Sequence, residues 1–516
     1  MSTQKNLLLS ARNNPFLAPI DSILTDQNLH QRLSSSPLKG LDMASISKQA
    51  RYDLLAVMAQ EFFVPSLTSA DSTSRLYSLI RKGYIPRDPT EISARKRAIT
   101  ISRFAGAELR NLPWLPGFAA GMKFDGITGL GKTYEIRRAI DQFLPRIEHG
   151  RSEAADWTHF YQIPVLYVGM SHDGSIGGLL YQILVAIDVA LDTDYSTQRR
   201  LTSLANEKLA VQVGILLSLH AVGVLIIDEI QATNFSDGAR GTVARTFFLR
   251  MLNFGIPIVL IGNPMGMRFI NHFSQDLRRF SSGGSIQMHP FEKDDKNYRN
   301  ILAPAFWGYN IMPEPPGVAD PDGSILFEYC GGIRDFAGRV IASAQRIALD
   351  TEERRITRDH LDLAFNGPDF DEGERTIIRA FCNKDALALQ DFEDIPWEDY
   401  YKRWNKSEPR ESSGDSSSSA APSSDQKKKT STKNTLPTTS ASAEGAPPFV
   451  SPQQGATHAE STAKRMIAKR ARENNKEQKA KKIIAGLEAA DMRSEGVKRL
   501  LVKDLAEVID NHNDRS

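Results

Sequence analysis

The stretch from Gly126 to Thr133 constrains this chain more than any other. It reads G-I-T-G-L-G-K-T and matches the pattern G-x-x-x-x-G-K-[ST] at every fixed position. An apolar run precedes it and an amphipathic stretch follows it, so the loop joins a strand to a helix. Backbone N–H groups of such a loop can point at phosphate oxygens, and the helix dipole favours negative charge there. The pattern therefore predicts a bound nucleotide.

Each residue of this loop is a candidate for nucleotide contact. Lys132 is expected to reach the β- and γ-phosphates of ATP, and the Thr133 hydroxyl is expected to ligate Mg²⁺. The full predicted set is Gly126, Ile127, Thr128, Gly129, Leu130, Gly131, Lys132 and Thr133, with Asp228 from elsewhere in the chain.

The apolar runs of the central region predict a parallel sheet. They alternate with amphipathic stretches, which is the rhythm of strand–helix–strand units. The runs are continuous rather than alternating, as expected for strands covered by helices on both faces. The predicted strands are 119–124, 163–168, 222–227, 256–261 and 285–288.

A second motif, V-L-I-I-D-E-I-Q at 224–231, completes the predicted site. Two carboxylates follow four apolar residues at the carboxyl end of a strand, where ligands bind in open α/β sheets. Asp228 is predicted to hold Mg²⁺, and Glu229 is predicted to act as general base toward the attacking water. The adjacent Asp-Glu pair favours a nucleotide-hydrolysing machine over a small GTPase.

Four further residues are candidates for catalysis. Asn263 follows the fourth predicted strand and could contact the γ-phosphate, although Asn-Pro also favours a simple turn. Arg278 and Arg279 precede the fifth strand and could supply an arginine finger to a neighbouring subunit, or could merely cap a helix. Arg334, in G-G-I-R at the start of a predicted helix, could lie over the phosphates.

Composition changes divide the chain into five predicted regions. The stretch 411–424 contains 8 serines in 14 residues, which predicts a flexible tether, and the stretch 464–482 carries nine Lys or Arg residues. The predicted regions are a helical N-terminal extension (1–105), an α/β nucleotide-binding domain (106–290), a helical lid and extension (291–405), a disordered tether (406–462) and a basic helical tail (463–516).

The overall composition is that of a globular protein. Hydrophobic residues make up 41% and the formal net charge is only +2, so any basic surface must be local. The two cysteines, Cys330 and Cys382, show no metal-binding spacing and are consistent with a reducing cytoplasm. We expect no membrane association, because no apolar run approaches the ~18 residues that a spanning helix needs.

The ordered motifs resemble those of the AAA+ ATPases. Within that superfamily the chain resembles the TnsC/TniB regulators of cut-and-paste DNA transposition, over about residues 14–365. The stretches that carry this resemblance are "NNPFLAPI", "LYSLIRKGYIPRDP" at 76–89, "SHDGSIGGLLYQIL" at 171–184, "VLIIDEIQ" and "VLIGNPMGM" at 259–267. "SHDGS" is the most specific, because AAA+ proteins in general do not share it.

The resemblance implies an α/β AAA+ fold with a five-stranded parallel sheet and a small helical lid. It implies a bacterial ATPase that uses Mg²⁺, oligomerises as a ring or filament on double-stranded DNA, and links a target-selector protein to transposase subunits. Such an assembly needs basic side chains that face DNA phosphates. Our candidates, which could equally be ordinary exposed charges, are Arg199, Arg200 and Lys208.

Other partners and other functions stay open from the sequence. A second basic cluster could hold DNA or the target selector; it comprises Arg81, Lys82, Arg87, Arg95, Lys96 and Arg97. A replication initiator or helicase loader shares the whole motif set but should add a winged-helix or helix-turn-helix DNA reader. A signalling or secretion ATPase that binds only protein is a third possibility.

Overall fold

The computed structural model describes residues 13–20, 29–113, 119–171, 174–231, 238–268 and 278–405. The chain divides into two units, Met1–Ser413 and Gly414–Ser516, and every described residue lies in the first. The predicted tether and basic tail therefore lie outside the described residues. His172 and Asp173 of the "SHDGS" stretch and residues 269–277, before the two candidate finger arginines, lie outside them as well.

The N-terminal part is helical, as predicted, and its helices end near the prolines. Ser66 and Ser69 form a capping box at the start of α4, and Pro86 follows its end. The elements are η1 (Ala18–Ile20), α2 (Leu29–Leu33), α3 (Lys48–Glu61), α4 (Leu67–Tyr84), η2 (Ile85–Arg87) and α5 (Ile92–Ser102).

The central part alternates strands and helices. Its elements are η3 (Leu109–Asn111), β1 (Gly121–Gly126), α6 (Lys132–Ile140), β2 (Ile147–His149), β3 (Phe160–Gln162), β4 (Val165–Gly169), α7 (Ile176–Leu191), α8 (Arg199–Thr202), α9 (Asn206–Leu219), β5 (Val224–Ile230), α10 (Gly238–Phe254), β6 (Ile258–Gly262) and β7 (Gly284–Met288).

Five of these strands form one parallel sheet in the order β4-β5-β6-β1-β7. The α/β fold with a five-stranded parallel sheet, predicted from the sequence, is confirmed. The first four strands begin two residues later than predicted. Pro164 and Pro257 have no N–H to donate to a neighbouring strand, and Val222 donates instead to the Leu217 carbonyl. The short antiparallel pair β2–β3 was not predicted, because three-residue strands give almost no pattern.

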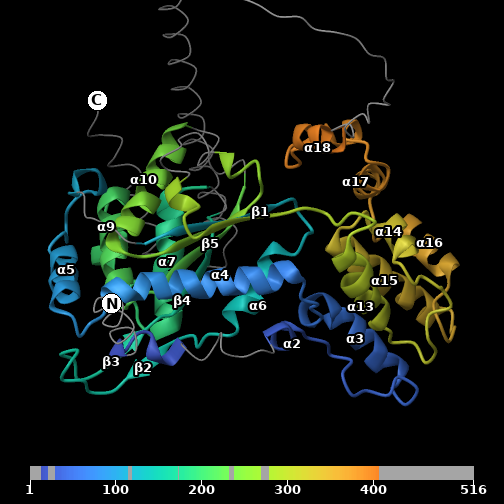
Figure 1. Cartoon of the computed structure of the whole chain (residues 1–516), viewed down its shortest axis with the longest axis horizontal. Helices are drawn as coiled ribbons and strands as arrows, with labels where there is room; N and C mark the ends of the chain where they lie inside the picture. Colours follow the sequence, from blue (N-terminus) through green and yellow to red (C-terminus); the bar gives the residue numbers. More distant parts are fainter. Residues whose placement is uncertain are drawn as a thin grey trace, which may run out of the picture. The chain divides into compact units, whose positions relative to one another are not determined.

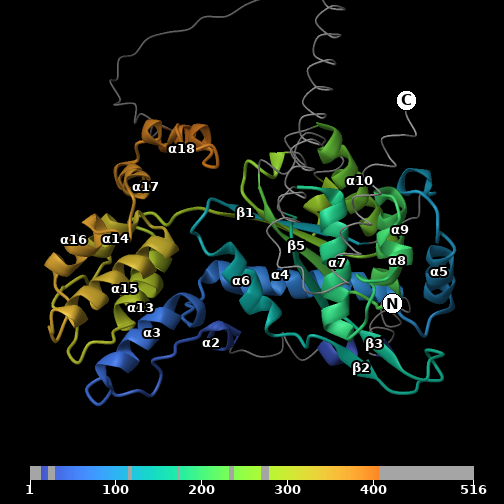
Figure 2. The same cartoon turned by 180° about the vertical axis from the view of Figure 1, so that it is seen from behind.

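The sheet is buried on both faces. In β5, Val224 and Ile226 join one hydrophobic core with α4 and α6, while Leu225 and Ile227 join a second core with α7, α9 and α10. Figures 1 and 2 show the same division, with α7, α9 and α10 away from α4. Alternate residues of a strand point to opposite faces, so continuous apolar runs supply both cores.

After β7, the regular elements of residues 289–405 are all helices, joined by loops. The elements are η5 (Tyr298–Leu302), α13 (Ala303–Gly308), α14 (Ser324–Cys330), α15 (Arg334–Asp350), α16 (Arg358–Asn366), α17 (Glu372–Asn383), η6 (Leu387–Leu389) and α18 (Trp397–Trp404).

The N-terminal helix α3 packs on this helical region. It lies beside α13 and α15 in both views (Figures 1 and 2), and the Tyr309 hydroxyl donates to the Leu54 carbonyl over 2.6 Å. Helix α3 and the helices α13 and α15, which are far apart in sequence, therefore lie close together beside the phosphate loop. This arrangement decides what lines the site.

Candidate nucleotide-binding site

The phosphate loop has the backbone shape that its glycines predict. Gly129 and Gly131 have φ of 83° and 85°, values that side-chain-bearing residues rarely adopt. A Cβ on Gly129 would lie 2.9 Å from the Ile333 side chain, and the Asp335 amide donates to the Gly129 carbonyl over 3.0 Å. The loop therefore opens α6 as predicted, and the start of α15 packs directly against it.

Lys132 lies at this loop among carboxylates. Its ammonium donates to the Ile127 carbonyl over 2.8 Å. Burial lowers the pKa of Lys132, while the charges of Asp228, Asp125 and Asp394 oppose that shift. An anionic phosphate at the loop would stabilise the charged form of the lysine further.

Thr133 and Asp228 are brought together from α6 and β5. The Thr133 hydroxyl donates to Asp228 Oδ2 over 2.8 Å. Asp228 is buried, and the Tyr167 hydroxyl donates to the same oxygen over 2.5 Å. Burial, and to a lesser degree hydrogen bonding to Asp228, raises the pKa of Tyr167. Sequence reasoning missed Tyr167; its place in the middle of β4, next to β5, was the available signal.

Glu229 has an unusual backbone at the end of β5. Its φ is 62°, a left-handed value that is costly for a residue with a side chain. The β5–β6 pairing is irregular between Ile227 and Ile230, and the Glu229 amide donates to Asp228 Oδ1 over 2.6 Å. The result turns the Glu229 carboxylate toward solvent beside Asp228 while the rest of β5 stays buried.

Asn263 lies at the neighbouring strand end, as predicted. Its backbone N–H donates to the Ile230 carbonyl over 2.9 Å, so the ends of β5 and β6 are adjacent. The side-chain oxygen accepts from the Met265 amide over 2.8 Å, and the side-chain nitrogen donates to the Asp394 carbonyl over 2.7 Å. Both functions of the side chain are therefore used within this structure.

Arg334 reaches the phosphate loop from the helical region. It is buried, and a Cβ on Gly131 would lie 3.6 Å from its Cδ. Its Nη1 lies 2.9 Å from Oε1 of Glu135, a fully buried carboxylate on α6. Burial raises the pKa of Glu135, and the positive charge of Arg334 opposes this shift. Among the described residues, Nε and Nη2 of Arg334 find no hydrogen-bond partner. These buried donors beside the loop fit an anionic ligand.

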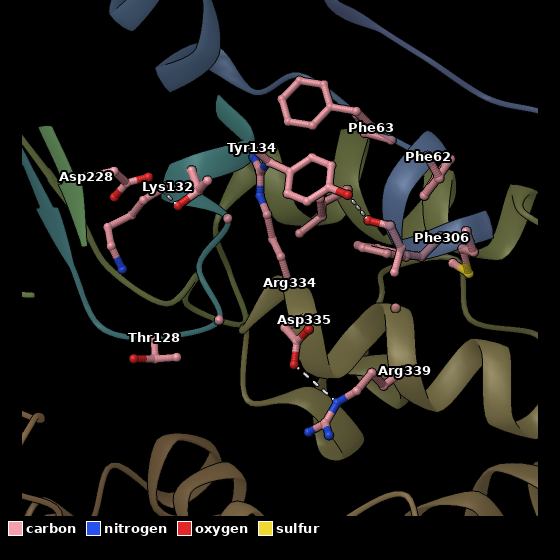
Figure 3. A pocket seen from close by; sticks show the side chains of 18 of the residues that line it. Phe62, Phe63, Thr128, Lys132, Tyr134, Asp228, Phe306, Arg334, Asp335 and Arg339 are labelled. Carbon is pink, nitrogen blue, oxygen red and sulfur yellow. Dashed lines mark hydrogen bonds and ion pairs between the residues drawn. The ribbon is translucent and has the colours of Figure 1, made fainter. Parts of the chain in front are cut away.

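The cavity continues from the loop to an apolar end. Its volume is about 440 Å³, and Figure 3 shows Lys132 and Asp228 at one end with Phe62, Phe63 and Phe306 toward the other. Its apolar lining comes from α3, the residues just after α3, η5 and α13: Leu55, Met58, Phe62, Phe63, Leu302 and Phe306. An apolar, aromatic-lined end of this kind suits a purine base. Sequence analysis identified none of these residues.

The two candidate finger arginines differ in their surroundings. Arg279 is half-buried and donates to the Asn253 side chain over 2.9 Å, whereas Arg278 is exposed. Arg278 is therefore the better placed of the two to contact another subunit.

The candidate DNA-contact residues lie on α8 and α9. Arg199 and Arg200 are exposed and Lys208 is half-buried, so the structure leaves the first two accessible. In the second basic cluster, by contrast, Arg87 is a packing residue. It donates to the Gly83 and Val222 carbonyls and lies over the Tyr84 ring, so the six residues do not form one exposed patch.

Comparison with known proteins is consistent with this geometry. A family described as "AAA domain" matches residues 120–270, which include the phosphate loop, Asp228, Glu229 and Asn263. The fold is of the AAA+ nucleotide-binding type. No curated protein matches the chain.

Several solved AAA+ structures are similar over the larger part of the chain. The Orc1 protein of Aeropyrum pernix in complex with DNA has 17% identity, covering 60% of this chain and 76% of that one, with a TM-score of 0.33. The RuvB Holliday junction branch migration motor of Thermotoga maritima has 14% identity over 60% and 87%, with a TM-score of 0.32. Domain III of the replication initiator DnaA from the same organism has 12% identity over 53% and 91%, with a TM-score of 0.28. At these values they do not bear on what the chain does.

Two further observations concern the described part of the chain. None of its helices is long and apolar enough to cross a membrane. No group of three or more His, Cys, Asp or Glu side chains is arranged there to hold a metal ion.

Proposed function

We propose that this chain is an ATPase. One observation carries the proposal: Lys132, Thr133, Asp228 and Arg334 meet at one end of a cavity whose other end is aromatic. A nucleoside triphosphate needs cationic and backbone donors at one end and an apolar, stackable surface at the other. The cavity offers both in one space.

The polar end suits Mg²⁺ with few protein ligands. The hydroxyl of Thr133 and the carboxylate of Asp228 are adjacent oxygen donors, and Mg²⁺ commonly keeps several waters and phosphate oxygens besides one or two protein ligands. Such an ion would neutralise charge on the phosphates. Tyr167 fixes the orientation of the Asp228 carboxylate through its hydrogen bond.

Glu229 would accept the proton of the attacking water. Its carboxylate is exposed at the strand end next to Asp228 and Asn263, where a water could lie between it and a terminal phosphate. The cationic side chains of Lys132 and Arg334 would neutralise negative charge on the phosphate oxygens. The left-handed backbone at Glu229 supports a functional role, since such strain concentrates at functional sites.

For the biological role, we propose an ATP-dependent regulator of DNA transposition of the TnsC type. The sequence stretches that resemble that family support it, and exposed Arg278 is compatible with a subunit that completes its neighbour's site. Head-to-tail contacts of that kind close into rings or continue as filaments. The proposed partners are double-stranded DNA, transposase subunits and a target-selector protein.

The replication-initiator alternative gains no specific support from the described part of the chain. A winged-helix DNA reader would add strands, and the regular elements of residues 289–405 are all helices. A helix-turn-helix reader is itself helical, so these elements do not argue against it. A protein-only ATPase differs in its response to DNA, so that response distinguishes the alternatives.

The test is ATP turnover by the full chain with and without random-sequence duplex DNA, together with negative-stain microscopy. We expect DNA to stimulate turnover and to yield rings or filaments. The Arg199→Gln, Arg200→Gln double variant should lower the slope of log affinity against log salt by up to about 2. If DNA changed neither ATP turnover nor assembly, the result would contradict the DNA-binding role and favour a protein-only ATPase.

The finger assignment has a separate test in mixed subunits. Arg278→Ala should bind ATP but fail to hydrolyse it, whereas mixing it with Glu229→Gln should restore part of the activity at mixed interfaces. Arg279→Ala serves as the control, because its bond to Asn253 predicts a loss of stability instead. If the mixture stayed inactive while the subunits co-assembled, Arg278 would not be the finger.

A further inference from the structure

A tight turn just before α18 contacts the phosphate loop. Asp394 is the residue in contact: its Oδ2 accepts from the Thr128 hydroxyl over 3.2 Å, and its carbonyl accepts from the Asn263 side chain over 2.7 Å. Thr128 and Asp394 are 266 positions apart in the chain, so the contact is a product of the fold. Nothing in the sequence motifs indicates it.

Asp394 is exposed and stands beside the cavity, where it contacts two residues that line it, Thr128 and Asn263. Asn263 stands at the end of β6, against the end of β5 that carries Asp228 and Glu229. The negative charge of Asp394 also stabilises the charged form of Lys132 and so opposes the lowering of its pKa by burial. Lys132 is the residue expected to contact the β- and γ-phosphates. The aromatic residues that suit a base lie at the other end of the same cavity. The carboxylate therefore stands where a γ-phosphate would add further negative charge.

We propose that Asp394 makes this site discriminate against nucleoside triphosphate in favour of diphosphate, and that triphosphate binding displaces the turn that carries it. The inference rests on the proposed nucleotide site. A carboxylate beside the expected γ-phosphate position repels a triphosphate more than a diphosphate, because only the triphosphate has charge there. A diphosphate can occupy the loop while Asp394 keeps its bonds to Thr128 and Asn263.

The turn is connected to a helix that would move with it. Ile395, next to Asp394, is buried, and the Trp397 amide donates to its carbonyl over 2.8 Å at the start of α18. Tyr400 of α18 packs against Phe381 of α17 and Trp404 at ring distances of 5.1 and 5.2 Å. Displacement of Asp394 would therefore loosen α18 from the strand ends. The chain continues from α18 into the predicted tether, so nucleotide state would be communicated in that direction.

The first test compares nucleotide affinities of the full chain. Asp394→Asn removes the charge but keeps the shape and an acceptor for Thr128. We expect the affinity ratio of a non-hydrolysable ATP analogue to ADP to rise about tenfold, the order expected for one like charge at this range. Glu393→Gln is the matched control, because it removes an exposed charge one residue away and should leave the ratio unchanged.

The second test measures hydrogen exchange in residues 391–404. The ATP analogue should increase exchange there in the wild-type chain, ADP should not, and Asp394→Asn should lose the difference. Binding of both nucleotides with an unchanged ratio in Asp394→Asn would contradict this inference alone. A lower turnover in that variant without a change in the ratio would make Asp394 a catalytic group instead and would also contradict it. A wild-type chain that bound neither nucleotide would overturn the proposed function and this inference together.

Discussion

The two ends of the nucleotide cavity are built in different ways. The phosphate end comes mainly from two short contiguous motifs at the carboxyl edge of the sheet, around Lys132 and Asp228, and α15 adds Arg334. The base end comes from α3 and α13, which lie about 240 residues apart in sequence and meet only in the fold. Directional contacts to phosphate oxygens require particular residues at particular spacings, whereas an apolar wall requires only the right volume. Substitutions at the two ends should therefore fail in different ways.

The largest effect is expected at Glu229. The Glu229→Gln variant should hydrolyse ATP about 10²–10⁴-fold more slowly, because it loses the general base but keeps the shape of the side chain. ATP affinity should change little, and assemblies on DNA should last longer. Single-turnover hydrolysis alongside nucleotide titration checks this. Normal turnover would remove Glu229 from the chemistry.

At the phosphate end, Lys132→Ala should weaken ATP binding about 100-fold, since charge-assisted contacts to phosphate are among the strongest in proteins. ATP should lose more affinity than ADP, because the lysine is expected to contact the γ-phosphate as well. Titration with both nucleotides measures the difference. Arg137→Ala, on the same helix and over the Tyr167 ring, is a control for loss of positive charge nearby.

At the base end, Phe62→Ala and Phe306→Ala should each weaken the binding of ATP and of ADP by the same factor of about ten. Stacking and apolar burial of the base do not depend on the number of phosphates. Phe62 also packs on Phe306 and Tyr309, at ring distances of 5.6 and 4.9 Å, so some stability will be lost. Phe365→Ala is the matched control, a helical-region aromatic that does not line the cavity. A phosphate-dependent loss at Phe62 or Phe306 would contradict the division between the two ends.

The smallest effect is expected at Tyr167. Tyr167→Phe removes the hydrogen bond to Asp228 but keeps the ring under Arg137, so Mg²⁺ dependence of turnover should shift by about threefold to tenfold. Titration of activity with Mg²⁺ at saturating ATP measures it. An unchanged Mg²⁺ requirement would make Tyr167 a packing residue only.

The same contrast explains what could be predicted from sequence. The sheet, the phosphate loop and the Asp228–Glu229 strand end were predictable, because each depends on neighbouring residues that leave a local pattern. The Glu135–Arg334 ion pair, the Tyr167–Asp228 bond and the Asp394 contact were not, because each joins residues far apart in the chain. Strand β5 shows both cases: its apolar run predicted the strand, while the left-handed backbone at Glu229 follows from its pairing with β6.

The catalytic roles of the nucleotide-site residues and the transposition partners stay predictions, and so do four further groups. The Arg199, Arg200 and Lys208 contacts with DNA depend on an assembly of several copies. The flexible tether and the basic tail, which we expect to contact transposase subunits, lie outside the residues that the structure describes. The four boundaries between the five predicted regions, and the choice of Arg278 over Arg279, also stay predictions.

The most direct test of the account is photolabelling of the full chain with an azidoadenine analogue of ATP, followed by peptide mapping. The cavity predicts labelled peptides from residues 55–64 or 302–306, since these line its apolar end. Unlabelled ATP should compete for the label, and Lys132→Ala should remove most of it at a probe concentration near the wild-type Kd. Labelling confined to other parts of the chain, or labelling that is undiminished in Lys132→Ala, would contradict the claim that one cavity holds both the base and the phosphates.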